Sequence, residues 1–259
     1  MSIYTDAQLQ HMREEFHSLR EKYENLLLAM VRFEFTSDRS KEFAHHGFLR
    51  RLKVLKFAID TVFERLPPDS TDLPEDGQIE MAMMALHAFY TNVFGCFDNL
   101  ARVIVIERQI TRPNGEELDR HEIGMRRNNR RVRECVSDGL REQLEETDPW
   151  FDHLEEFRHP LAHRIPLYIA PHYVTNENVE RYQHLERERM DALFAENLED
   201  YEMLSEEQNQ LKRFAPLMGH SFHEESPQVY FHAQIIADYL TVHKFGELAL
   251  EEIGNARDQ

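Results

Sequence analysis

The chain has 259 residues, of which 41% are hydrophobic and 30% are charged, and its formal net charge is −18. This composition is typical of a globular protein long enough for one large domain. The negative charge disfavours broad, nonspecific binding to nucleic acid or to an anionic membrane. The sequence also has no run of about 18 apolar residues, which argues against a membrane span.

Glycine and proline are scarce, with 9 and 10 copies, which favours an all-α protein. The N-terminus lacks the basic and apolar regions of a signal peptide. Cys96 and Cys135 have no disulfide or metal spacing, so we interpret them as reduced packing residues. We therefore expect a cytoplasmic protein without membrane contact.

The first half of the chain predicts three long helices. The first has one apolar stripe across residues 9–30, and Thr5 or Asp6 can cap its start. A second helix, residues 41–66, is stopped by Pro67 and Pro68. The third, residues 78–110, is apolar around most of its circumference, including Met81 and Met84, and is predicted to lie at the centre of a bundle.

The second half is more varied. A loop is predicted over residues 111–124, then helices over 128–145 and 149–158. Residues 165–174 are β-branched and aromatic, are broken by two prolines, and could pair as an extended element with residues 214–222. A last helix is predicted over residues 228–253. The expected fold is a single domain, residues 1–259: a bundle of long helices with a short extended, hairpin-like element and a helical insertion.

The insertion, residues 175–213, is strongly acidic. Residues 177–207 contain 11 acidic residues against 3 arginines. Such a segment resembles a helical arm that leaves the bundle. It supports one functional hypothesis: a noncatalytic interaction or scaffold protein whose acidic arm engages a basic protein partner.

The densest cationic chemistry lies at the end of the predicted 149–158 helix and just beyond it. Arg158, His159, His163 and Arg164 fall within seven residues. A guanidinium and a neutral imidazole held together can bind a phosphate and move a proton near pH 7. Pro160 could kink or end the helix and thereby turn Arg158 and His163 toward one pocket.

The run Arg158-His159-Pro160-Leu161-Ala162-His163 resembles the signature of the HEPN superfamily, an arginine, a polar residue, three further positions and a histidine. The resemblance implies a helical bundle, often a homodimer, with a metal-independent ribonuclease site at the dimer interface, or a degenerate relative of such an enzyme. It further implies that Arg158 stabilises the phosphate and that His163 transfers a proton. His159 would orient or polarise the reacting groups.

The residues themselves permit this chemistry. An imidazole could take the proton from a ribose 2′-hydroxyl, whose oxygen attacks the neighbouring phosphorus, while Arg158 stabilises charge on the phosphoryl oxygens. The mechanism requires no metal and no cofactor. The alternative is structural: Arg158 and His163 could bond carbonyls freed by the prolines, or pair with Glu155 and Glu156.

Two further groups could support such a site. Asp98 and Asn99 lie on the apolar third helix, where Asp98 could hold Arg158 or His163, or could instead pair with Arg102. The second group is an arginine-rich run that, with Arg164, could bind phosphate or RNA, or could simply form a solvated helix start: Arg126, Arg127, Arg130 and Arg131.

Glu-x-x-His occurs three times, at Glu14/His17, Glu42/His45 and Glu156/His159. Paired motifs of this kind build di-iron sites in helical bundles. Because the chain is rich in glutamate, we keep a di-iron carboxylate bundle as a distant alternative and predict no metal site.

Overall fold

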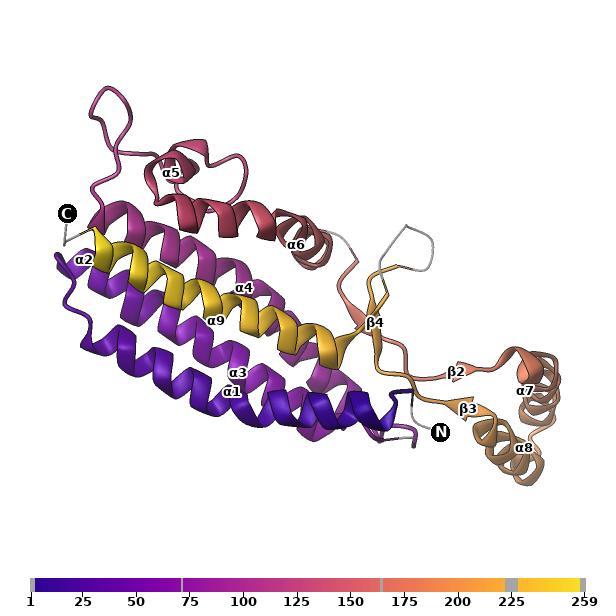
Figure 1. Cartoon of the computed structure of the whole chain (residues 1–259). Coiled ribbons are helices and arrows are strands. Elements are labelled where there is room, and N and C mark those ends of the chain that lie inside the picture. The colour runs from indigo at the N-terminus through magenta and orange to yellow at the C-terminus, as the bar shows by residue number, and fades with distance from the viewer. Residues whose placement is uncertain (1–2, 71, 164, 222–227, 257–259) are drawn as a thin grey trace.

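The computed structural model describes residues 3–70, 72–163, 165–221 and 228–256; within the last turns of one helix, the side chains of residues 159, 160, 162 and 163 are not described. The fold is a mostly helical bundle with a few short antiparallel strands (Figure 1). Four long helices form its body: α1 (Asp6–Arg32), α3 (Leu49–Arg65), α4 (Gln78–Glu107) and α9 (Phe231–Asn255). This confirms the predicted fold class.

Local sequence explains where α1 begins. Thr5 caps the helix: its hydroxyl accepts a hydrogen bond from the Gln8 amide at 3.3 Å, and its own amide donates to the Gln8 side chain at 2.9 Å. This reciprocal pair satisfies two backbone donors that the first turn leaves without partners. The predicted apolar stripe is buried, including Leu9, Leu19 and Leu26.

The predicted second helix consists of three consecutive parts: α2 (Asp38–Glu42), a π-helical turn η1 (Phe43–Phe48), and α3. Phe48 and Leu52 are fully buried, as the stripe predicts. Gly246 of α9 explains how closely the helices approach here, because a Cβ at this position would lie 2.7 Å from Leu26 and 2.8 Å from Phe48.

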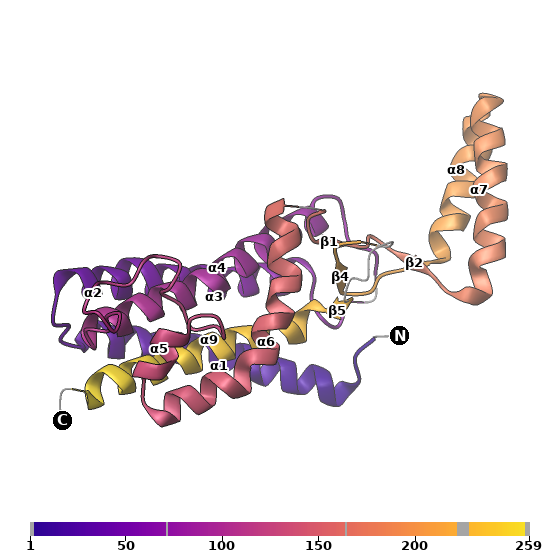
Figure 2. The ribbon, with the colours of Figure 1, turned by 90° about the horizontal axis from the view of Figure 1, so that it is seen from above.

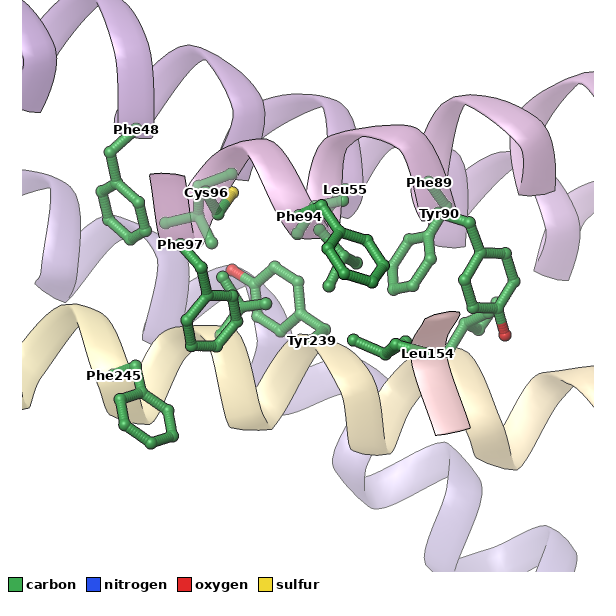
Figure 3. Close-up of a cluster of buried hydrophobic side chains, with 14 of the residues drawn as sticks. Phe48, Leu55, Phe89, Tyr90, Phe94, Cys96, Phe97, Leu154, Tyr239 and Phe245 are labelled. Carbon is green, nitrogen blue, oxygen red and sulfur yellow. The ribbon is translucent and has the colours of Figure 1, made fainter. Parts of the chain in front are cut away.

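Helix α4 is the centre of the bundle and contacts α3, α6 and α9. Figure 3 shows its aromatic side chains meeting residues of the neighbouring helices, including Phe48, Leu154 and Tyr239. The prediction that α4 is buried almost all round is wrong at its first turns. Met81 and Met84 are 43% and 72% exposed, because α3 alone flanks this face among the described elements.

After the loop that follows α4, α5 (Arg130–Cys135) leads into α6 (Asp138–His163). The predicted helix ends at residues 145 and 158 are wrong, because α6 continues through Pro149 and Pro160. Its two halves run in different directions (Figure 2). An interior proline removes one backbone hydrogen bond and kinks a helix without necessarily ending it, so Pro149 accounts for the bend.

The strands join the bundle to a projecting arm. The predicted pairing of the two extended stretches is confirmed: β1 (Tyr168–Ile169) lies antiparallel to β4 (Leu217–Gly219), which also pairs with β5 (Val229–Tyr230). A second pair, β2 (Tyr173–Val174) and β3 (Lys212–Arg213), carries the arm. The arm consists of a 3₁₀ turn (Asn176–Asn178), α7 (Val179–Phe194) and α8 (Leu198–Gln210), and points away from the bundle (Figures 1 and 2).

No helix in the described part of the chain has both the length and the apolar character that crossing a membrane requires.

Candidate functional site

The second half of α6 places Arg158 over α4. Its guanidinium carbon lies 4.7 Å from the centre of the Phe94 ring, a cation–π contact. Phe157, one position earlier, is fully buried and stacks on Tyr90 with 5.1 Å between ring centres. Arg158 itself is exposed, and among the described residues it has no ion pair with an acid. Its positive charge therefore remains available at the surface.

The remaining motif residues, His159, His163 and Arg164, have side chains outside the described residues. The backbone of α6 is continuous to His163. Five helical positions correspond to a rotation of about 140° between Arg158 and His163 around the axis. Pro160 does not end the helix, so the backbone by itself does not turn the two positions to one face.

The structure places the two polar residues of the third predicted helix, Asp98 and Asn99, on α4. Asp98 is exposed, and Arg102 packs its guanidinium against the Phe43 ring at 5.3 Å rather than pairing with Asp98. Asn99 is half-buried and donates to the Gly95 carbonyl at 2.7 Å. Asn99 therefore has a backbone role within α4.

The arginine-rich run is largely engaged within the chain. Arg126 pairs with Glu155, and Arg127 pairs with Asp148 at 3.0 Å and with Asp152 at 3.3 Å. Arg131 donates to the Thr111 carbonyl at 2.6 Å, whereas Arg130 is exposed. Three of the four candidate phosphate ligands thus already have acceptors, and Arg130 is the one for which no acceptor is found among the described residues.

A further arginine just after this run, Arg133, is more deeply buried than the four. It donates to both oxygens of Asp148 at 2.9 and 2.5 Å and to the Met125 carbonyl. The pKa of Asp148 is lowered: burial opposes the shift, but hydrogen bonds from Arg133 and Arg127 outweigh it. Such a bidentate, buried pair holds the loop before α5 against α6. This segment is therefore chiefly structural.

Sequence reasoning missed a buried carboxyl in α9. Asp238 accepts hydrogen bonds at Oδ1 from the Trp150 indole and from the Gln234 amide, both at 2.8 Å. Its Oδ2 has no hydrogen-bond partner among the described residues. Burial raises the pKa of Asp238 to about 7, although these hydrogen bonds oppose the shift. The only sequence signal is an acid inside the apolar run Ile235-Ile236-Ala237-Asp238-Tyr239-Leu240.

A cavity of about 290 Å³ lies at the C-terminal end of α4. Apolar side chains such as Ile110 and Leu118 line it, together with Arg39, Arg102 and one acid, Glu117. Its size and lining suit a small apolar molecule that carries a negative group. Asp238 is not among its lining residues, so the buried carboxyl does not serve this cavity.

In the part of the chain that the structure describes, no group of three or more histidine, cysteine, aspartate or glutamate side chains is placed to hold a metal ion.

The arm exposes apolar side chains where α7 turns into α8. Phe194 is 79% exposed and Leu198 is 64% exposed, and Leu193 and Met203 are also exposed. We call residues 190–203 the arm tip. They include five acidic residues and no basic one. An exposed apolar cluster with a charged rim marks an interaction surface.

The arm holds itself together largely through polar contacts. Gln208 is buried between its helices and donates to Glu186 at 2.5 Å, Arg189 pairs with Glu186 at 2.9 Å, and Arg181 pairs with Glu207. Leu185 is the only fully buried apolar side chain of α7. The apolar residues of the tip are thus not needed for the packing of the hairpin.

Fold and site together define a helical-bundle protein with a projecting, acidic helical hairpin. Comparisons with protein-family models, with curated proteins and with solved structures found no match to this chain.

Proposed function

We propose that this chain is a noncatalytic interaction protein that uses its acidic arm to dock on a partner. The observation that carries the proposal is the exposed apolar tip, led by Phe194. A solvent-exposed phenylalanine at the end of a projecting hairpin has no packing role within the chain. It is the kind of aromatic anchor that dominates protein interfaces when it becomes buried.

The rim of acids around the tip adds selectivity. Glu196, Glu199 and Asp200 surround the turn between α7 and α8, and all three are exposed. Charges at the edge of an interface steer association and repel partners of the same sign. The tip therefore favours a partner with an apolar depression that has basic residues at its edge.

Site-specific photocrosslinking in cells of the source organism tests the proposal. Benzoylphenylalanine at position 194 should give one discrete crosslinked adduct on illumination, since the tip is buried against its partner. The matched control is the same substitution at Gln183, an exposed position nearer the base of α7. Absence of an adduct from position 194, or equal adducts from both positions, contradicts docking through the tip.

A second candidate function is the HEPN-like, metal-independent ribonuclease. The exposed Arg158 favours it, because its charge is not neutralised by any described acid, unlike that of Arg126 or Arg127. We propose that an active enzyme would use Arg158 on the phosphate and His163 for proton transfer, in a homodimer acting on RNA.

Cleavage of single-stranded RNA in the presence of a chelator tests this candidate. Arg158→Ala and His163→Ala should each lower the rate roughly 100-fold or more while helix content is unchanged. His184→Ala, at an exposed arm histidine, is the matched control and should retain full activity. If the purified protein does not cleave RNA, or if the variants cleave as fast as the wild type, Arg158 and His163 are not catalytic.

A further inference from the structure

A second exposed apolar surface lies on the bundle, between α3 and α4. It is a groove of about 250 Å³, which we call the α3/α4 groove. Its most exposed lining residues are Phe57, at 70%, and Met84, at 72%. Its other lining residues are Val54, Ala58, Thr61, Met81, Ala85 and Ala88.

The edge of the groove is basic along the first part of α3. Residues 49–64 contain four basic residues, all before Phe57, and two acids after it, Asp60 and Glu64. Two of the basic residues, Arg50 and Lys53, are exposed. Arg50 lies four positions before Val54, and Lys53 lies four positions before Phe57, so each shares a side of the helix with a lining residue. At this end the groove has the properties that the arm tip selects, an apolar depression bordered by positive charge, whereas Glu64 and Glu80 are exposed near its other end.

We infer that the partner of the arm is a second copy of this chain, whose α3/α4 groove receives Phe194 and Leu198 of the tip. This inference rests on the proposed function of the arm. The apolar tip fills the apolar groove, and the acids around the tip face Arg50 and Lys53. One copy carries both surfaces, so two copies can exchange arms around a two-fold axis and cover both surfaces at once.

The arrangement of the chain suits such an exchange. The arm leaves the bundle at the end where α4 begins, and the groove lies along the first turns of α4 (Figures 1 and 2). With 16 residues, α7 carries the tip about 24 Å from its first residue. In the single chain the arm points away from its own bundle, which leaves the groove open to another copy.

Analytical ultracentrifugation of the purified full chain over a wide range of concentrations tests the inference. The wild type should form a dimer, and Phe194→Glu and Phe57→Glu should each weaken the dimer on the order of tenfold or more. Val31→Glu, at an exposed apolar residue of α1, is the matched control and should dimerise as the wild type does. Circular dichroism of all variants should show unchanged helix content, since the three positions are exposed.

Mixing the two defective variants provides a stricter test. Phe194→Glu retains an intact groove and Phe57→Glu retains an intact arm, so the mixture regains one arm–groove contact that neither variant has alone. We expect a heterodimer in the mixture. If Phe57→Glu abolishes dimerisation and mixing does not restore it, the grooves pack on each other and the inference is wrong.

A monomer at every concentration also overturns the inference. This outcome is distinguishable from failure of the proposed function, because the mass of the photocrosslinked adduct at position 194 identifies the partner. An adduct of twice the chain mass supports self-association. An adduct of another mass shows that the arm docks on a different protein and that the groove is not its receptor.

Discussion

Asp238 shows how one residue can link the packing of three helices to the acidity of the medium. Its carboxyl group lies in α9, accepts a hydrogen bond from Trp150 of α6, and interacts electrostatically with the buried Tyr90 of α4. Burial disfavours the charged form of the carboxyl and raises its pKa from 3.8 to about 7. The native state therefore holds a proton that the unfolded chain has already released above pH 4.

The pH dependence of stability follows from this difference. Between pH 4 and 7 the native state binds more protons at Asp238 than the unfolded state, so this residue makes stability fall as pH rises. By pH 7 the stability lost in this way is on the order of 4 kcal/mol. Asp238→Asn cannot ionise, so its stability relative to the wild type should rise between pH 4 and 7 and then stay constant up to pH 8, as measured by urea denaturation.

Asp238→Leu separates the effect of the charge on stability from the effect of the hydrogen bonds. It leaves the Trp150 and Gln234 donors without an acceptor and should be less stable than Asp238→Asn at every pH, by roughly 1–3 kcal/mol. Parallel stability curves for the wild type and Asp238→Asn would show that the carboxyl titrates normally in the fold.

His232 has the opposite effect. It is buried, its Nε2 bonds the Leu66 carbonyl at 2.6 Å, and burial lowers its pKa to about 4. The unfolded chain therefore binds more protons at this site between pH 4 and 6.5, so His232 makes stability rise with pH in that window. Both the wild type and Asp238→Asn contain His232, so its contribution cancels in the difference between their stabilities.

At the scale of elements, periodicity predicts where helices exist better than where they end. The stripe of α1 and the stop at Pro67 and Pro68 are local signals, and both are confirmed. Pro149 and Pro160 are also local signals, yet α6 continues through both. Aromatic packing of Phe151 and Phe157 on α4 holds the second half of α6 in place. Tertiary contacts of this kind outweigh a local break and cannot be deduced from one segment.

The candidate sites show the same limit. The sequence places Asp98 on an apolar helix, but its exposure depends on which face of α4 the neighbouring helices leave uncovered. Met81 and Met84 are exposed for the same reason. Conversely, Asp238 is buried because α4 and α6 both cross α9 at that position. Periodicity identifies an apolar face, whereas burial also requires a partner element that the periodicity does not identify.

At the scale of the whole molecule, the arm and the bundle have separate cores. The main apolar core contains Leu167, Ile169 and Phe214 at the base of the arm but no described residue of α7 or α8. Residues 177–207 also account for much of the negative charge, with 11 acidic residues against 3 arginines. Sequence composition identifies this division, whereas the direction of the arm and the position of the α3/α4 groove depend on the fold.

Removal of the arm should therefore leave a folded bundle. Val174 of β2 pairs with Lys212 of β3, so an Asn-Gly turn can replace residues 175–211 and close a two-residue hairpin. We expect cooperative thermal unfolding with stability within about 1 kcal/mol of the full chain, since no core contact is lost. Calorimetry measures this, and ultracentrifugation of the same variant should show a monomer. Loss of cooperative unfolding would mean that the arm supports the bundle, and its acidic tip would then be part of a structural element rather than a free docking surface.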